Sequence, residues 1–429
     1  MLDIKLIRES PDQVRRNLER RNDRDKLVLL DSVIDYDERW RASITELNQM
    51  RRRRNEVSME IAELKRSGRH VEAEEKIREA EALPAKIAEK ETQVEELSGL
   101  VRNGLMRIPN LLHESVPFGK DENDNVEVKR WGKPPRFDFE PKDHFEVAQG
   151  LDLIDGERAA KVAGASFFYL KDELVLLDMA VQRFAVDFLI TRGFKPIEPP
   201  LMIKRRPYEG VTDLADFESV MYKVQDEDLY LIATSEHPMA AMFMDEVLLA
   251  EQMPLRFCGV SPCFRREVGS HGKYTKGLFR MHQFNKVEQF VFCLPEQSRQ
   301  IHEELQDNSE SLYQKLGLHY RVVNVCTGDI GIIAAKKYDI EFWMVDDTFR
   351  EIGSNSNCTD YQARRLSIRY REKEGAPPVG FVHTLNNTAI ATSRTMLAIL
   401  EQYQQADGSV IVPEALRPYM NGMEVLRKE

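Results

Sequence analysis

Residues 35–101 place the strongest limit on how this chain of 429 residues folds. The segment contains two glycines and one proline and is dense in Arg, Glu, Ala and Leu, a composition that favours long helices. Apolar residues recur at three- and four-residue spacing in two stripes, 47–64 and 83–101, whose polar gaps are Arg54 and Lys90. The residues between the stripes, 67–70, read Ser-Gly-Arg-His. The pattern predicts an antiparallel helical hairpin, in which a helix of about 30 residues reaches about 45 Å.

Four consecutive arginines, Arg51, Arg52, Arg53 and Arg54, lie within the first stripe. Their guanidinium groups would cover more than half of the helix circumference and repel one another without an anionic partner. The run therefore indicates contact with a nucleic-acid backbone, while a dimerisation or spacer role for the hairpin stays open. Pro84 lies inside the second stripe and is expected to kink that helix or to mark its first stable turn.

Composition limits the partners and the compartment. The net charge of -11 argues against a nucleic-acid coat over the whole surface, so an RNA site has to be a local patch. The five cysteines form no CxxC pattern, which favours free thiols in a reducing compartment over structural zinc. The N-terminus lacks an apolar signal core, and the most apolar stretch, 174–190, is interrupted by charged residues. We expect a cytoplasmic protein without a membrane segment.

The stretch 264–290 gathers charged, aromatic and turn residues. It predicts two strands, 263–268 and 278–290, joined by a glycine-rich basic loop. A period of two puts Arg265 and Glu267 on one face of the first strand, and Arg280, Phe284 and Glu288 on one face of the second. Guanidinium groups suit phosphate or carboxylate, a phenyl ring can stack on a base, and a carboxylate can hold an ammonium group. The set suits an anionic nucleotide beside a small zwitterion, although an antiparallel pair with solvated charges stays an alternative.

The remaining segments predict a sheet surrounded by helices. Residues 108–132 indicate a linker, and 174–192 a helix that ends at Gly193. The prolines of 193–200 predict a loop or an edge position. Further strands are expected at 320–325, 338–345 and 381–384. Residues 385–402 start polar and become helical, which would place Thr388 and Arg394 near a helix start that favours an anion. In 229–244, Thr234, Ser235 and Glu236 would form a capping box or contact a substrate.

Four segments together resemble the seryl-tRNA synthetase family of class II aminoacyl-tRNA synthetases. They are FRREVGS at 264–270, GLFRMHQFNKVEQF at 277–290, EIGSNSNCTDYQARR at 351–365 and LNNTAIATSRTMLAILE at 385–401. The resemblance implies an α+β fold, with an N-terminal antiparallel helical hairpin (a coiled-coil arm) and a class II catalytic domain whose antiparallel sheet is flanked by helices. It implies a tRNA-binding domain at 1–107, with the arm at about 35–101, and a catalytic domain at 108–429, with 108–132 as its linker.

The implied activity is serine–tRNA ligation. The family joins L-serine to ATP with magnesium, releases pyrophosphate, and transfers serine to the 3′ end of tRNA(Ser), which carries a long variable arm; charging of tRNA(Sec) stays open. Residues 193–200, with Pro200, resemble the family's dimer motif, so a homodimer is implied, with neither DNA nor membrane as a partner. Two alternatives are an amino-acid:carrier-protein ligase, which lacks the arm and uses zinc, and a non-catalytic tRNA-binding paralogue.

The resemblance also implies roles for individual residues. The residues implied in catalysis are Arg265, Glu351 and Arg394. Those implied in serine binding are Thr234, Ser235, Glu236, Arg265, Glu288, Asn386 and Thr388. Those implied in ATP binding are Arg265, Arg266, Glu267, Met281, Phe284, Glu351, Ile352, Gly353, Ser354 and Arg394. Glu351 and Ser354 would hold magnesium, and Arg51, Arg52, Arg53 and Arg54 would bind tRNA. A paralogue without activity would be expected to lack Arg265, Glu288, Glu351 or Arg394, and all four are present.

Some positions depart from the commoner pattern of the family. Asn387-Thr388 and the ATSR at 391–394 resemble the archaeal and eukaryotic branch. Gly353 and Asn355 stand where Ser and Cys are usual.

Overall fold

The computed structural model describes residues 1–213, 220–266 and 277–428. The chain divides into two compact units. We call Leu2–Pro109 the arm unit, and Met1 together with the chain from Asn110 onward the sheet unit.

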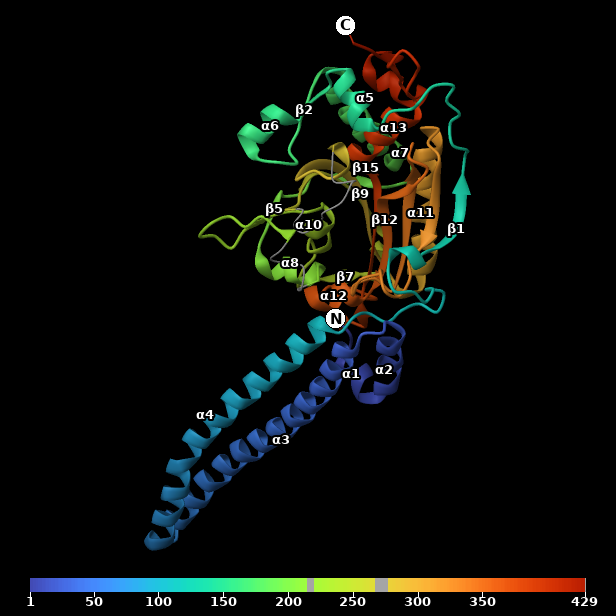
Figure 1. Ribbon diagram of the computed structural model, residues 1–429. Helices are drawn as coiled ribbons and strands as arrows, with labels where there is room; N and C mark the ends of the chain where they lie inside the picture. The colour runs from blue at the N-terminus through green and yellow to red at the C-terminus, as the bar shows by residue number, and fades with distance from the viewer. Residues whose placement is uncertain (214–219, 267–276, 429) are drawn as a thin grey trace. The chain divides into compact units, whose positions relative to one another are not determined.

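The arm unit is helical throughout its regular structure (Figure 1). Its helices are α1 (Ile4–Glu9), α2 (Pro11–Arg20), α3 (Arg24–Arg66) and α4 (His70–Arg107). The predicted antiparallel hairpin is confirmed, but α3 has 43 residues and therefore extends about 65 Å. It begins earlier than expected because Asp23 caps it, accepting a hydrogen bond from the backbone N–H of Lys26 at 3.1 Å. Gly68, with a φ of 72°, provides the left-handed turn between the two long helices.

Apolar side chains of α3 and α4 form the seam of the hairpin. Buried members of the seam are Leu47 and Val57 from α3 and Leu83, Ile87, Leu97 and Val101 from α4. Arg53 is partly buried and Arg54 is exposed, so the polar position that faces the seam is one residue earlier than predicted. Helix α4 runs through Pro84 and starts well before it, so this proline does not mark the first turn.

The sheet unit is built on an eight-stranded sheet with the order β1-β10-β11-β12-β15-β9-β8-β4. The strands are β1 (Val126–Trp131), β4 (Lys195–Ile197), β8 (Leu255–Phe264), β9 (Gln283–Cys293), β10 (Tyr320–Asn324), β11 (Lys336–Trp343), β12 (Phe349–Thr359) and β15 (His383–Ala391). All neighbours are antiparallel except β4 and β8. The predicted α+β class, with an antiparallel sheet flanked by helices, is confirmed.

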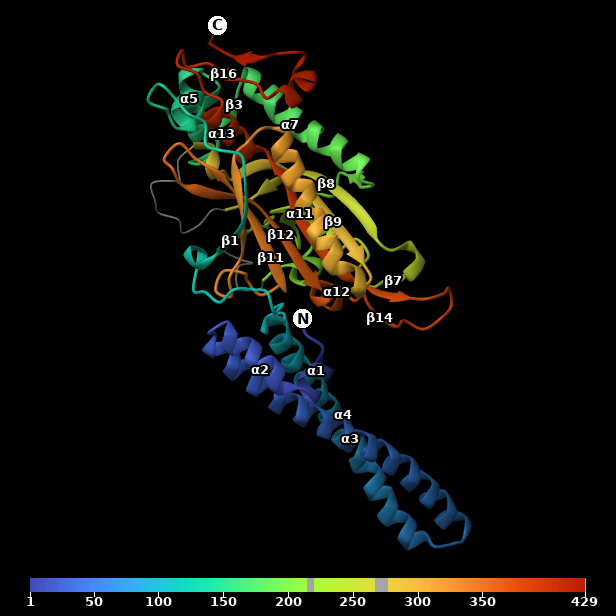
Figure 2. The same ribbon diagram turned by 90° about the vertical axis from the view of Figure 1, so that its right-hand side faces the viewer.

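Helices cover the two faces of this sheet differently. Helices α7 (Asp172–Thr191) and α11 (Ser298–Lys315) pack on one face, where α11 runs along β15 and β12, and α13 (Thr392–Gln402) joins α7 (Figure 2). Shorter helices, α8 (Arg205–Val211), α10 (Glu236–Ala240) and α12 (Tyr361–Leu366), belong to the other face. Side chains alternate along β9, so Val287 and Val291 belong to the core under α7 and α11, while Phe290 and Phe292 belong to a second core on the other face.

Smaller elements complete the sheet unit. They are helices α5 (His144–Gly150) and α6 (Gly156–Ala163), the strand groups β2 (Ile154–Asp155) with β3 (Tyr169–Leu170), β5 (Met202–Ile203) with β6 (Tyr230–Leu231), β16 (Val410–Ile411) with β17 (Val425–Leu426), and β7 (Val247–Leu249) with β13 (Arg369–Arg371) and β14 (Gly380–Phe381). No helix of the described residues is long and apolar enough to cross a membrane.

Several predicted boundaries differ from the structure. Part of the predicted linker, 126–131, is the edge strand β1, which pairs with β10. Residues 195–197 form the edge strand β4, so the edge position suggested by the prolines is confirmed. β8 starts earlier than predicted and ends at Phe264, and β9 starts only at Gln283, after the short 3-10 helix Gly277–Phe279. Most of the predicted basic loop lies outside the described residues.

The segment 385–402 is half strand and half helix. Thr388 lies on β15 and not near a helix start, because 383–391 pairs with β9 and β12 on its two sides. Arg394 does lie in the first turn of α13. Helix α7 ends as expected before Gly193, whose φ is 82°.

Candidate active site

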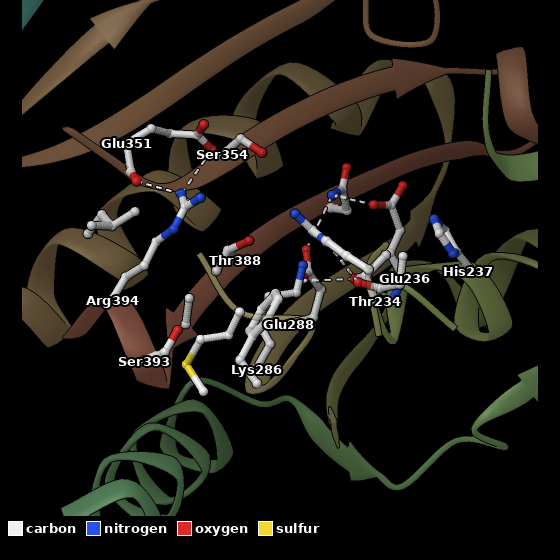
Figure 3. A pocket seen from close by; sticks show the side chains of 18 of the residues that line it. Thr234, Glu236, His237, Lys286, Glu288, Glu351, Ser354, Thr388, Ser393 and Arg394 are labelled. Carbon is white, nitrogen blue, oxygen red and sulfur yellow. Dashed lines mark hydrogen bonds and ion pairs between the residues drawn. The ribbon is translucent and has the colours of Figure 1, made fainter. Parts of the chain in front are cut away.

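A cavity of about 340 Å³ lies on the face of the sheet away from α11. Strands β9, β12 and β15, the segment around Thr234 and the start of α13 supply its wall (Figure 3). The sequence-predicted residues that line it are Thr234, Glu236, Arg265, Met281, Phe284, Glu288, Glu351, Ile352, Gly353, Ser354, Asn386, Thr388 and Arg394. The structure therefore gathers most of the predicted site from segments far apart in the chain.

Three predicted residues that the structure describes do not line this cavity. Ser235 is fully buried behind it and donates a hydrogen bond from Oγ to the Gly259 carbonyl at 3.4 Å. Arg266 is exposed, and Arg280 precedes β9 instead of sharing a strand face with Phe284. Glu267 lies outside the described residues.

One end of the cavity is acidic. Glu288 is fully buried and forms an ion pair with Lys286, which is 6% exposed. Thr234 Oγ1 donates to Glu288 Oε2 at 3.4 Å. Asn386 Nδ2 bridges two carboxylates, donating to Glu236 Oε2 at 2.9 Å and to Glu288 Oε1 at 3.3 Å. Because Lys286 compensates one of the two carboxylates, this end can accept one further positive group beside several hydroxyl partners.

Burial tunes the titratable groups at this end. Desolvation, together with the nearby charge of Glu288, raises the pKa of Glu236 to about 7. Desolvation, together with Lys286 and Arg265, lowers the pKa of His237 to about 3, so this imidazole is neutral at physiological pH. Glu236 also accepts a hydrogen bond from Gln362 Nε2 at 3.1 Å, which fixes its orientation. Near neutral pH, the approach of a cation would favour the ionised form of Glu236.

The other end of the cavity combines guanidinium groups with aromatic rings. The Arg265 guanidinium carbon is 5.3 Å from the Phe284 ring centroid, and that of Arg394 is 4.8 Å from the Phe279 ring centroid. Arg394 also donates to the backbone carbonyl of Glu351 and lies 3.9 Å from its carboxylate. Flat cationic and aromatic surfaces of this kind suit a planar base and phosphate groups.

A β-bulge brings Glu351 and Ser354 to the same wall. In the register of β11 and β12, Ile340 pairs with Gly353 and Glu341 with Glu351, so Ile352 is the extra residue. Residues three apart on a regular strand face opposite sides, but after this extra residue both side chains line the cavity (Figure 3). Desolvation would raise the pKa of Glu351, but Arg394 and Lys337 outweigh it and hold that pKa below its ordinary value.

A row of buried amides supports the opposite face of the same strands. Asn355, Asn387 and Gln289 are register partners on β12, β15 and β9. Asn355 Nδ2 donates to the His302 carbonyl at 2.9 Å, while Asn387 and Gln289 both donate to the Leu305 carbonyl, at 2.6 and 3.2 Å. Helix α11 thus fixes the positions of β12, β15 and β9 from behind. The residues next to the three amides, Ser354, Thr388 and Glu288, point the other way and line the cavity. Asn355, which stands where the family usually has Cys, is thus bound to the backbone of α11.

Among the wall residues that sequence reasoning missed are Lys286, His237 and Phe279. Lys286 lies between Phe284 and Glu288 at the same period of two, so the rule that selected those two residues selects it as well. His237 follows the TSE sequence directly, and Phe279 lies in the segment between the strands; their roles come from contacts that spacing alone does not reveal.

The arginine run of the arm has anionic partners within the arm unit. Arg51 pairs with Glu91 at 2.7 Å, Arg52 with Glu56 at 2.9 Å, and Arg53 with Glu79 at 2.7 Å and with Glu60 at 2.8 Å. The argument that the run needs an external anion is therefore wrong for these three residues. Arg54 is exposed and makes no ion pair within the described residues.

Comparisons with known proteins agree with this geometry. Residues 1–112 match the family described as Seryl-tRNA synthetase N-terminal domain, and residues 222–403 match the tRNA synthetase class II core domain (G, H, P, S and T). A serine–tRNA ligase of Methanocella arvoryzae is 57% identical over 99% of this chain and 100% of its own length. The chain belongs to the seryl-tRNA synthetase family.

Solved structures of the seryl-tRNA synthetase family have the same fold. The crystal structure of seryl-tRNA synthetase from Pyrococcus horikoshii complexed with ATP has a TM-score of 0.95 and 47% identity, and the match covers both chains completely. Cytoplasmic serine–tRNA ligase from Naegleria fowleri in complex with AMP has a TM-score of 0.88 and 37% identity, covering 100% of this chain and 99% of that one.

Proposed function

We propose that this chain is a serine–tRNA ligase that activates L-serine with ATP and transfers it to tRNA(Ser). In the first step a serine carboxylate oxygen attacks the α-phosphorus of ATP, and the bond to pyrophosphate breaks. In the second step a ribose hydroxyl at the 3′ end of the tRNA attacks the seryl carbonyl, and AMP leaves with the bonding electrons. The observation that carries the proposal is a single cavity with an acidic, hydroxyl-lined end and a cationic, aromatic end.

The acidic end would bind serine. Glu236 and Glu288 would receive the ammonium group and the side-chain hydroxyl, with Thr234, Asn386 and Thr388 supplying further polar contacts. Lys286 would remain the ion-pair partner of Glu288 in its buried position. Because these buried groups would lose a partner with alanine, alanine should be rejected strongly.

The cationic end would bind ATP. Arg265 would contact the α-phosphate and the serine carboxylate together, which aligns the reacting atoms, while Phe284 and Arg394 would enclose the adenine ring. Met281, Ile352 and Gly353 would line the nucleotide. Catalysis would then consist of positioning and charge stabilisation, with no covalent intermediate on the protein.

Glu351 and Ser354 fit a magnesium site. Their carboxylate and hydroxyl line the cavity together, and the lowered pKa of Glu351 keeps its carboxylate ionised. The donor set suits Mg²⁺, which commonly takes one or two protein oxygens and completes its shell with water and phosphate oxygens. When bound, the ion would neutralise phosphate charge. No group of three or more His, Cys, Asp or Glu side chains suited to a metal occurs among the described residues.

The two units would divide the work. The predicted tRNA-binding domain, residues 1–107, would bind the long variable arm of the tRNA, with Arg54 more available than its paired neighbours Arg51, Arg52 and Arg53. The sheet unit would catalyse both steps and would form a homodimer through the region that includes Pro200. We place the protein in the cytoplasm. The comparisons support neither a carrier-protein ligase nor a paralogue without activity.

Amino-acid-dependent exchange of pyrophosphate into ATP, measured with all twenty amino acids, tests the proposal. Serine should give by far the strongest signal, and its absence with the native protein would reject the assignment. Glu288→Ala should reduce serine activation much more than ATP binding, because Glu288 lies at the acidic end. Equal losses for both substrates would mean that Glu288 acts only through the fold.

A further inference from the structure

Gly353 on β12 lies unusually close to Thr388 on the neighbouring strand β15. A Cβ atom at residue 353 would lie 2.9 Å from Thr388 Cβ, 3.1 Å from its Cγ2 and 3.4 Å from its carbonyl oxygen. Carbon atoms that are not bonded prefer a separation of about 3.5–4.0 Å. Any side chain at position 353 would therefore displace Thr388 or separate the two strands.

Two β-bulges flank this contact. Ile352 is the extra residue of β12 against β11, and Ala389 is the extra residue of β15 against β9. Bulges bend a strand locally, and a strand glycine often marks a close approach of two backbones. The bulges lie directly beside Gly353 and Thr388, so the contact belongs to a part of the sheet with irregular geometry.

Thr388 belongs to a row that crosses four neighbouring strands. It pairs in register with Glu288, and Glu288 pairs with Gly259 on β8. A Cβ atom at Gly259 would lie 2.6 Å from Met239 Cε and 2.7 Å from the hydroxyl oxygen of the serine that precedes α10. A glycine therefore lies at each end of the row, and the two cavity-facing side chains lie between them.

The two glycines differ in how strictly they are required. The Met239 methyl group is the end of a flexible chain and can rotate away from a new Cβ atom. Thr388 Cβ is bonded to the backbone and Thr is restricted at χ1, so it can move only if the strand moves. A side chain added at Gly353 would therefore move Thr388, which lines the cavity, and so change the shape of the cavity.

We propose that Gly353 is a positioning residue for amino-acid specificity, because the space it leaves sets where Thr388 lies opposite Glu288. The pair then sets the width of the pocket that admits the hydroxymethyl group of serine and excludes the extra methyl of threonine. This inference rests on the proposed function. It adds a role in amino-acid selection to a glycine that otherwise only lines the nucleotide.

A set of four variants tests the inference by serine- and threonine-dependent pyrophosphate exchange. Gly353→Ala should lower kcat/KM for serine by about 10- to 100-fold, because displacements of about 1 Å have effects of this size, and should change KM for ATP much less than KM for serine. Thr388→Ser removes Cγ2 and should raise the use of threonine relative to serine by about tenfold, the effect of one methyl group.

The two double variants test whether the positions are coupled. G353A/T388S should have a kcat/KM for serine about fivefold higher than Gly353→Ala, since the clash with Cγ2 is gone. G353A/T388V keeps the Cβ and Cγ2 atoms at residue 388, so its kcat/KM for serine should be no higher than that of Gly353→Ala.

Gly150→Ala is the matched control, because nothing lies within 4 Å of a Cβ atom at Gly150. Strictly additive effects in the G353A/T388S cycle, or a KM for ATP that rises with that for serine, would overturn the inference. If Gly353→Ala fails to fold in a thermal unfolding assay, the inference is tested by the preference for serine over threonine in Thr388→Ser and in G353A/T388S. Absence of serine-dependent exchange in the native protein would instead reject the proposed function.

Discussion

The arm unit and the cavity both pair basic side chains with glutamates, but in opposite surroundings. Arg53 of the arm and its partner Glu79 each keep 36% of their side-chain surface exposed. In the cavity, the corresponding fractions are 7% for Lys286 and 0% for Glu288. Exposed pairs contribute little to folding, whereas a buried pair has a high desolvation cost and depends on its partner. The comparison indicates that the apolar seam, and not the ion pairs, stabilises the arm. It also indicates that Lys286 and Glu288 serve substrate binding more than folding.

The largest effect is expected from breaking the buried pair. Lys286→Met should leave Glu288 buried without its cation, which destabilises proteins by about 3–5 kcal/mol. Serine-dependent exchange should fall to background because the acidic end loses its charge balance. Chemical unfolding and pyrophosphate exchange measure the two effects.

The double variant K286M/E288L separates stability from activity. Replacing both charges by apolar groups should recover most of the lost stability, and serine-dependent exchange should stay at background. Recovery of activity in this variant would show that the pair only supports the fold.

The pH dependence of serine binding is the second effect in size. With a pKa of about 7, Glu236 is mostly protonated at about pH 6 and mostly ionised at about pH 8, a change of about tenfold in the ionised fraction. Only the ionised form attracts the serine ammonium group, so KM for serine should fall as the pH rises through this range. KM for ATP, measured in parallel, is the internal reference. The variant Glu236→Gln should have a KM for serine that no longer depends on pH, and an unchanged slope would assign the titration to another group.

A smaller effect is expected from the arginine run. Replacing Arg51, Arg52, Arg53 and Arg54 by Gln should leave serine-dependent exchange intact and weaken tRNA charging severalfold. The salt dependence of charging should also become flatter, since phosphate contacts release counterions. The single variant Arg54→Gln should account for most of the change, because its three neighbours already pair with glutamates. Unchanged charging of a tRNA with a long variable arm would make the arm a spacer.

The smallest effect is expected for the stability of the arm. Arg53→Gln should shift the unfolding midpoint only slightly, and the shift should shrink further in high salt, because its ion pairs are exposed. Leu47→Ala, which removes a buried residue of the seam, is the contrasting variant and should destabilise clearly more. A larger loss of stability for Arg53→Gln than for Leu47→Ala would contradict the conclusion that the apolar seam, and not the ion pairs, stabilises the arm.

The sequence predicts best what depends on local pattern. The hairpin follows from apolar spacing in a segment with few glycines, and Phe284 and Glu288 follow from the alternation of one strand. The strand expected at 381–384 covers only the start of β15, and the rest, 385–391, was missed because Asn386 and Asn387 look like residues of a turn or cap. In the folded chain Asn386 donates hydrogen bonds to Glu236 and Glu288, and Asn387 donates one to the Leu305 carbonyl of α11, more than 80 residues away. Buried polar residues whose partners lie far along the chain cannot be assigned from their neighbours.

The bulge at Ile352 also limits how this strand can change over evolutionary time. A deletion of that single residue would leave the composition of the motif almost intact, but it would restore regular alternation and turn 349–351 to the opposite side of the sheet relative to Ser354. A substitution beside the bulge keeps this alternation, whereas a change in the length of the strand would require a matching change in its paired strands. In this motif the residue count is as much a determinant of the site as the residue types.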